Sequence, residues 1–271
     1  MIWVLACLGA AYLVVLGTIY LRQRDLLYHP QLHSPTDEEL RAVGLAPWRT
    51  TTADGLTLRH FYMPPESESA PVMVVFHGNA GSAAGRAEKY FFASEEGAGL
   101  LLAEYRAFGG NPGSPSEEGL LADGRSVLKA LVEEGVAPER IVLYGESLGS
   151  GVSVAMAGVH AGEGRPLGGV ILEAPFTSVA AAAQRRFWYL PAYWLVRDRF
   201  DSLSRIDGLG APLLILHGER DRTIPFDQGR ALFQAAPDPK EFLGVAEAGH
   251  VDLHDFPQVD RRVRTFLADM R

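Results

Sequence analysis

A serine between two glycines is the clearest chemical signature in this sequence. Residues Gly145–Gly149 read GESLG, with Ser147 at the centre. An apolar run, Arg140–Tyr144, precedes the motif, and a helix-forming stretch, Leu148–Val159, follows it. This order is typical of a sharp strand-to-helix turn that lifts a serine hydroxyl above the edge of a sheet. The flanking glycines are needed because side chains there would collide with the neighbouring strand and helix. We therefore predict that Ser147 is a nucleophile; the alternative is a glycine-rich turn with an incidental serine.

A serine hydroxyl is a weak nucleophile until a base removes its proton, so a histidine must be close to it. Where serine sits on such a turn, the acid and then the histidine follow it along the chain. Asp221 comes on the loop after the apolar run Leu213–Leu216. His250 comes on the loop after Glu241–Val245. The sequence thus predicts His250 as the base and Asp221 as its supporting acid.

Other residues compete for these two roles. His254 is the main rival of His250, but it lies near the final helical stretch rather than on a loop tip. Glu173, at the end of an earlier strand, is the alternative acid. A zinc site made by His250 and His254 would need a third ligand, and the sequence marks none near them. The histidines that precede the serine, or that lie in a helix or at a strand end, are given no catalytic role: His29, His33, His60, His160 and His217.

Acyl transfer also needs N–H donors for the negative oxygen of the tetrahedral intermediate. The apolar run Val72–Phe76 ends in a glycine-rich turn, His77–Gly81. We expect the backbone N–H groups of Asn79 and Leu148 to point at that oxygen. The alternative for His77–Gly81 is a plain strand-to-helix turn.

The elements that must position these residues alternate regularly along the chain. Short apolar runs separated by helical stretches predict a mostly parallel α/β sheet with helices on both faces. Asp54-Gly55 predicts a hairpin, and hence an antiparallel N-terminal edge. The expected strands are Trp48–Thr52, Thr57–Met63, Val72–Phe76, Gly99–Glu104, Arg140–Tyr144, Gly169–Leu172, Leu213–Leu216 and Glu241–Val245. The expected helices are Arg86–Glu96, Glu117–Glu134, Leu148–Val159, Asp227–Gln234 and Phe256–Met270.

The first segment, Ile2–Leu21, contains no charge and no proline. As a helix it would extend about 30 Å, the thickness of the hydrocarbon core of a bilayer. A signal peptide has its basic residues before the apolar run, whereas here Arg22 and Arg24 follow it. A core helix would carry a polar face, and this segment has none. We predict a membrane anchor over residues 1–24 and a catalytic domain over 25–271, on the cytoplasmic side by the positive-inside rule.

Composition limits the partners. A formal net charge of −8 without a cluster of Lys and Arg argues against nucleic acid. The one cysteine, Cys7, lies in the apolar first segment and excludes an intrachain disulfide. We expect no metal and no organic cofactor, because a serine, a histidine and a carboxylate suffice for acyl transfer.

Together these motifs resemble the membrane-anchored branch of the α/β-hydrolase superfamily, which includes protein depalmitoylases and lipid esterases. The resemblance implies the α/β-hydrolase fold, the same triad and the same oxyanion donors. The family usually has Asp-Tyr-Arg-Gly where this chain has Glu104–Ala107, and alanine tolerates fewer backbone conformations than glycine. The resemblance covers Leu26 to the end and rests on Leu27–Pro30, His77–Gly81, Tyr105-Arg106, Gly113–Gly119, Gly145–Gly149, Glu173–Phe176 and the loops with Asp221 and His250.

These expectations describe a membrane esterase or thioesterase whose substrates are acyl esters or thioesters, with membrane lipid as its surroundings. A peptidase or an acyltransferase would use the same triad, and a silent membrane scaffold is the alternative outside enzymology. A short lid-like insertion at about 176–210 contains both aromatic residues and arginines, a mixture that suits a membrane interface. It therefore predicts substrates with medium to long acyl chains. The alternative is an ordinary helix packed on the sheet, whose aromatic side chains belong to the hydrophobic core. The residues concerned are Arg185, Arg186, Phe187, Trp188, Tyr189, Tyr193, Trp194, Arg197 and Phe200.

Overall fold

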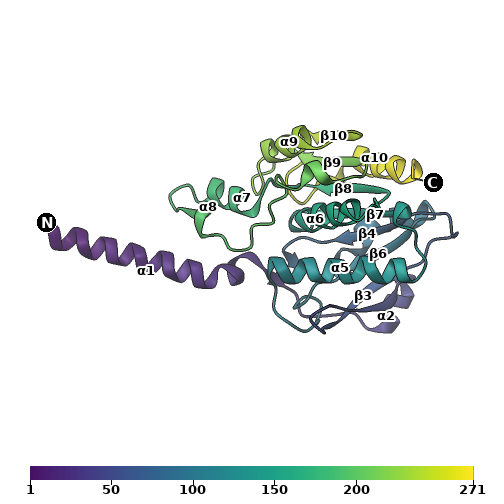
Figure 1. Ribbon diagram of the computed structural model, residues 1–271, viewed down its shortest axis with the longest axis horizontal. Helices are drawn as coiled ribbons and strands as arrows, with labels where there is room; N and C mark the ends of the chain where they lie inside the picture. Colours follow the sequence, from purple (N-terminus) through teal and green to yellow (C-terminus); the bar gives the residue numbers. More distant parts are fainter. Residues whose placement is uncertain (271) are drawn as a thin grey trace.

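A twisted, mostly parallel sheet forms the centre of the protein (Figure 1). A computed structural model describes residues 1–270. Within them eight strands pair in the order β10-β9-β8-β7-β4-β6-β3-β2, and only β3 pairs antiparallel, with β2 and β6. The predicted parallel sheet with an antiparallel N-terminal edge is confirmed. The strands are β2 (Ala46–Thr51), β3 (Thr57–Met63), β4 (Val72–Phe76), β6 (Gly99–Ala103), β7 (Ile141–Glu146), β8 (Gly169–Glu173), β9 (Leu213–Gly218) and β10 (Lys240–Val245).

The central strands are apolar throughout because helices cover both faces of the sheet. Every residue of β4 is buried, and successive side chains enter opposite layers. Val74 belongs to the core layer under α5, α6 and α9, whereas Val75 belongs to the layer under α4 and α10. The helices that follow the hairpin are α3 (Ala87–Tyr90), α4 (Phe92–Glu95), α5 (Glu117–Glu133), α6 (Leu148–Gly162), α9 (Phe226–Ala235) and α10 (Pro257–Ala268), and α2 (Asp37–Ala42) precedes it.

One predicted helix differs from its expected form. In place of a single helix over Arg86–Glu96, the structure has a 3₁₀ turn followed by the two short helices α3 and α4. Phe91 joins them with φ −63° and ψ −18°, angles that are nearer to 3₁₀ than to α geometry. The regular hydrogen-bond pattern is therefore interrupted there, although the chain direction is kept.

The strand register gathers the predicted site residues at one edge of the sheet. Glu146, the last residue of β7, is opposite Glu173, the last residue of β8. Glu173 is in turn opposite Leu216 of β9. Ser147 therefore follows the end of β7 at the same edge as the loop that carries Asp221 after β9. Ligands of open parallel sheets bind beyond this carboxyl edge.

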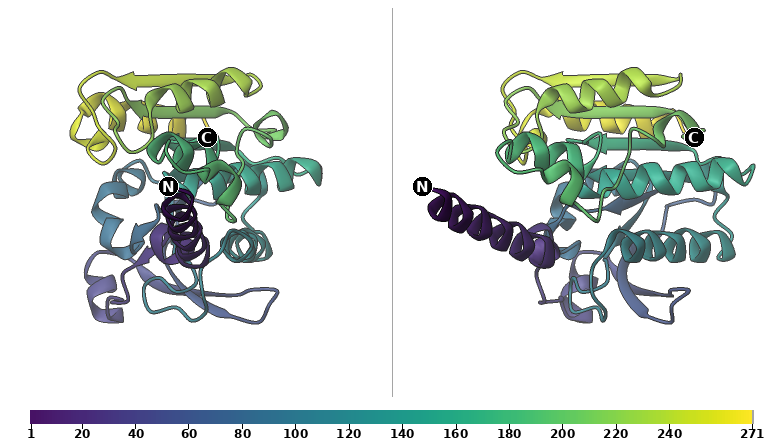
Figure 2. Two further views of the ribbon diagram at one scale, coloured as in Figure 1. Left: turned by 90° about the vertical axis from the view of Figure 1, so that its left-hand side faces the viewer. Right: turned by 60° about the vertical axis from the view of Figure 1, so that its left-hand side comes forward.

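The N-terminal helix α1 (Ile2–Leu27) projects away from the domain (Figures 1 and 2). None of its residues is buried, and its most apolar stretch has a mean hydropathy of 2.3. Among the described residues it is the one helix long and apolar enough to cross a membrane. After α1, Tyr28 alone separates the helix from the short strand β1 (His29–Pro30). β1 pairs in parallel with β5 (Ala80–Gly81), a contact that sequence patterns did not indicate.

The segment between β8 and β9 contains two short helices, α7 (Val179–Arg186) and α8 (Ala192–Leu195), on the side from which α1 projects (Figure 1). Trp188 and Trp194 are 79% and 81% exposed. Phe187, Tyr189 and Tyr193 are exposed as well. The alternative that the aromatic side chains of this insertion belong to the hydrophobic core is therefore wrong for these five residues.

Phe200 was expected among these exposed rings but is fully buried. Its backbone N–H and that of Arg199 both donate to the Glu117 carboxylate at the start of α5. These bonds hold the end of the insertion against the domain, where the Phe200 ring packs beside Gly151 of α6.

Candidate active site

Ser147 occupies a strained turn between β7 and α6. Its φ is 50° and its ψ is −111°, a sparsely populated combination that costs a non-glycine residue about 1–3 kcal/mol. A Cβ atom on Gly149 would lie 1.9 Å from the carbonyl oxygen of Phe76 in β4. A Cβ atom on Gly145 would lie 2.6 Å from the carbonyl oxygen of Gly149. The predicted reason for the two glycines is confirmed: the strand and the helix leave no space for side chains.

The structure brings Ser147, His250 and Asp221 into a chain of contacts. His250 Nε2 lies 3.1 Å from Ser147 Oγ, and His250 Nδ1 lies 2.6 Å from Asp221 Oδ2. The other carboxylate oxygen of Asp221 accepts the backbone N–H groups of Thr223 and Ile224, both at 2.8 Å. This arrangement orients the imidazole so that Nε2 faces the serine hydroxyl.

The surroundings of Asp221 keep its carboxyl group ionised. Burial raises its pKa, but hydrogen bonds from His217 and His250 and the N–H of Ile224 outweigh burial. The net result is a pKa well below the usual range for aspartate. His217 lies under the carboxylate, 3.5 Å from Asp221 Oδ2, and its Nε2 is 3.0 Å from the carbonyl oxygen of Ile224. An ionised Asp221 can stabilise an imidazolium formed on His250.

The two rival residues bond to other partners. His254 Nδ1 lies 2.6 Å from Asp260 Oδ1, and its Nε2 lies 2.9 Å from the hydroxyl of Tyr144. Glu173 forms an ion pair with Lys89 at 2.7 Å. Across residues 1–270, no group of three or more His, Cys, Asp or Glu side chains is arranged to hold a metal ion.

Asn79 and Leu148, the two predicted oxyanion donors, line one cavity together with Ser147. Leu148 is the first residue of α6, where a backbone N–H has no acceptor within the helix. Asn79 is held from two sides: its side-chain amide donates to the carbonyl of Leu27 at 2.6 Å, and its own carbonyl accepts the N–H of His29 at 2.8 Å. The last residues of α1 and the first of β1 thus position the Asn79 turn.

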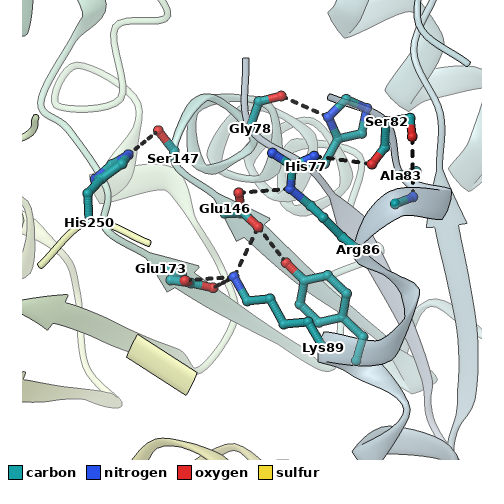
Figure 3. A network of polar contacts seen from close by, with 12 residues as sticks. His77, Gly78, Ser82, Ala83, Arg86, Lys89, Glu146, Ser147, Glu173 and His250 are labelled. Atoms are coloured by element: carbon teal, nitrogen blue, oxygen red, sulfur yellow. Dashed lines mark hydrogen bonds and ion pairs between the residues drawn. The ribbon is translucent and has the colours of Figure 1, made fainter. Parts of the chain in front are cut away.

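A partly buried polar network surrounds Glu146, the residue before Ser147 (Figure 3). The Glu146 carboxylate accepts hydrogen bonds from Arg86 at 3.1 Å, Lys89 at 3.0 Å and the Tyr90 hydroxyl at 2.8 Å. Lys89 also binds Glu173, the carboxylate beside Glu146 on the next strand. Burial raises the pKa of Glu146, but Lys89 and Arg86 lower it more, so its pKa lies below the usual range.

Sequence reasoning missed this network, although one signal for it was available. Each of the predicted strands Arg140–Tyr144 and Gly169–Leu172 is followed within two residues by a glutamate, and the observed pairing places Glu146 and Glu173 side by side. Two such groups need a cation between them. Lys89, from the helical stretch after β4, supplies it.

The segment Glu104–Ala107, where the chain departs from the usual family pattern, has a backbone conformation at Ala107 that favours glycine. Ala107 has a φ of 68° and so adopts the left-handed region despite its Cβ atom. Arg106 before it donates to Asp123 at 2.8 Å and anchors the loop on α5. Glu104 Oε1 lies 3.0 Å from His77 Nε2. This hydrogen bond connects the loop to the turn that carries Asn79.

Known proteins share this architecture. No family model matches the chain. The esterase Pf2001 of Pyrococcus furiosus superposes with a TM-score of 0.69 at 21% identity, covering 90% of this chain and all of the esterase. The uncharacterized protein MT2364 of Mycobacterium tuberculosis (strain CDC 1551 / Oshkosh) is 35% identical over 260 residues, 94% of this chain and 90% of that protein. The lysophosphatidylserine lipase ABHD12 of Danio rerio is 31% identical over 212 residues, 73% of this chain and 54% of the lipase. The chain belongs to the α/β-hydrolase superfamily.

In this α/β hydrolase the cavity next to Ser147 has a volume of about 470 Å³. Its wall is mainly apolar, with Leu27 from the end of α1, Phe176 after β8, and Val179 and Phe187 from the insertion. The polar side chains of the wall include Arg186 and Arg222, which are at its rim with Thr223. Such a cavity suits a ligand that is mostly hydrocarbon and has one polar reacting centre.

Proposed function

We propose that this α/β hydrolase is a membrane-attached serine hydrolase that cleaves carboxylic esters or thioesters of medium to long acyl chains. The observation that carries the proposal is the run of contacts from Ser147 through His250 to Asp221, beside an apolar cavity. The three residues come from the loops after three different strands, which is the expected chain order for this superfamily.

The proposed reaction proceeds through an acyl-enzyme. His250 Nε2 takes the proton of Ser147 as Oγ attacks the carbonyl carbon, and the N–H groups of Asn79 and Leu148 hold the resulting oxyanion. The intermediate collapses as His250 returns the proton to the leaving alcohol or thiol. Water, deprotonated by His250, then attacks the acyl-serine and releases the carboxylic acid. Asp221 stabilises the imidazolium in both steps.

Three observations support an acyl substrate at a membrane surface. The cavity beside Ser147 is bounded by apolar side chains of α1 and of the insertion at 176–210, which we propose acts as a lid. The relative from Danio rerio carries the name lysophosphatidylserine lipase, so a related sequence is assigned to an acyl lipid. The exposed aromatic rings of the insertion suit the boundary between a bilayer and water.

We further propose that residues 1–24 anchor the protein and that residues 25–271 form the catalytic domain. The helix α1 has the length, the hydropathy and the exposure that a bilayer span requires. Arg22 and Arg24 at its C-terminal end favour a cytoplasmic domain.

The reaction is tested with p-nitrophenyl esters of graded chain length and with an S-acyl peptide. We expect kcat/KM to be roughly tenfold or more higher for the octanoate than for the acetate, because each buried methylene adds binding energy. The preference should weaken when Trp188 and Trp194 are both changed to alanine. An enzyme that prefers acetate to octanoate would contradict the proposed substrate class, and inactivity on every ester and thioester would contradict the reaction.

The anchor is tested by a chain that begins at Asp25. We expect it to leave the membrane fraction and still hydrolyse p-nitrophenyl acetate, because Ser147, Asp221 and His250 lie outside the deleted part. The deletion also removes the Arg24–Asp198 ion pair, so Arg24→Met in the full chain is the matched control: it loses the pair but keeps the anchor. A well-folded truncation without activity would show that α1 belongs to the catalytic core.

A further inference from the structure

A second cavity lies between α1 and the insertion, next to the cavity beside Ser147. Its volume is about 350 Å³, within the range of small-molecule sites. Four residues line both cavities: Leu27, Val179, Ala183 and Phe187. The two cavities are therefore adjacent, and the second reaches along α1 as far as Ile19.

Polar contacts fix the end of α1 against the insertion, so this second cavity has a firm wall. Arg24 forms two hydrogen bonds with the buried carboxylate of Asp198, at 2.9 and 3.0 Å, and the Tyr28 hydroxyl adds a third at 3.1 Å. The Gln23 side chain bonds to the carbonyl of Leu195 and accepts the N–H of Arg197 at 2.7 Å. The α1 residues on the cavity wall are thereby held opposite those of α8.

The wall of the second cavity is mainly apolar and suits a hydrocarbon chain better than a peptide. Ile19 and Leu26 from α1 face Leu190, Leu195 and Val196 from the insertion. The polar side chains among the described residues that line it are Tyr20, Gln23 and Tyr189, and both the oxygen and the nitrogen of the Gln23 amide are already bonded. A ligand with many N–H and C=O groups would leave most of them without partners in this space, at a cost of about 1–3 kcal/mol each.

The position along α1 places this cavity at the edge of a bilayer. The part of α1 beyond it, from Ile2 to Thr18, extends about 25 Å at 1.5 Å per residue, close to the thickness of the hydrocarbon core. With that part in the membrane, Ile19 stands at the boundary and Ser147 lies outside it.

We propose that the cavity between α1 and the insertion binds the acyl chain of the substrate, so that the chain extends from the bilayer along Ile19 and Leu27 to Ser147. This inference rests on the proposed function. It assigns α1 a second role as one wall of the substrate site. The carbonyl group reaches Ser147 while the far end of the chain remains between α1 and α8.

The test compares two variants of the full-length protein in phosphatidylcholine vesicles. Ile19→Trp puts a large ring into the cavity, whereas Leu21→Trp makes the same change at a residue of α1 that is 78% exposed and lines neither cavity. The readout is the ratio of kcat/KM for p-nitrophenyl dodecanoate to that for p-nitrophenyl acetate. We expect Ile19→Trp to lower this ratio by about 10- to 200-fold, as expected for lost methylene contacts. Leu21→Trp should keep the wild-type ratio.

Each result decides whether the second cavity binds the acyl chain of the substrate or another molecule. An unchanged ratio in Ile19→Trp overturns the proposal, whether the variant keeps both activities or loses both equally. If Ile19→Trp shifts only the melting temperature, the cavity holds a structural lipid and the proposal fails. A preference for the dodecanoate over the acetate in the wild type and in Leu21→Trp shows in either case that the proposed function stands, so failure of the acyl site and failure of the proposed function are separate outcomes.

Discussion

We expect Ser147→Ala to abolish labelling by a fluorophosphonate probe and to lower kcat for ester hydrolysis by about four to six orders of magnitude. The reason is that the probe and the substrate both react with the same oxygen, the Oγ that lies 3.1 Å from His250 Nε2. The fold should be kept, because alanine tolerates the turn at least as well as serine does. Gel fluorescence with the probe and a p-nitrophenyl octanoate assay measure the two effects.

A surface serine provides the control for this experiment. Ser204→Ala changes an exposed residue of the loop before β9 and should leave labelling and kcat at the wild-type level. Persistent labelling of Ser147→Ala would show that another residue is the nucleophile.

His250→Ala is expected to reduce kcat nearly as much as Ser147→Ala, whereas His254→Ala should leave most of the activity. The members of a triad act as a unit, so the loss of either costs about the same, and Asp221→Asn should cost somewhat less. His254 contacts Tyr144, Glu173 and Asp260 instead. Its loss removes hydrogen bonds from buried groups and should lower the free energy of unfolding by about 1–3 kcal/mol.

The pair of histidine variants therefore separates catalysis from stability. Steady-state kinetics on p-nitrophenyl octanoate gives the first effect, and urea unfolding gives the second. A larger loss of kcat in His254→Ala than in His250→Ala would show that the base has been assigned to the wrong residue.

Local sequence was sufficient for the parts of the fold that depend on neighbours along the chain. Continuous apolar runs such as Val72–Phe76 predicted the parallel strands, because only a strand buried on both faces has that composition. Since the carboxyl ends of parallel strands meet at one edge, the chain positions of Ser147, Asp221 and His250 also predicted that they would approach one another. The structure places them within hydrogen-bonding distance.

Contacts between residues distant in sequence could not be predicted in this way. Arg24 and Asp198 are 174 residues apart, and neither position carries a local pattern that points to the other. The pairing of β1 with β5 involves two residues on each side, too few for any periodicity. The backbone conformation of Ala107 could not be predicted from local sequence either. Its residue type argued against the left-handed backbone, but surrounding bonds such as Arg106–Asp123 hold the loop there.

The short path from α1 to the serine turn determines which substrates the site can meet. Only Tyr28 stands between the helix and β1, and β1 is hydrogen-bonded to the turn that carries Asn79. A hydrolase on a long flexible tether can rotate and act on a neighbouring vesicle. If α1 anchors the protein as we propose, its bonds to the domain keep the catalytic face at one height and one orientation above the membrane. We therefore expect the enzyme to act in cis, on molecules of the leaflet on its own side of the membrane that holds its helix.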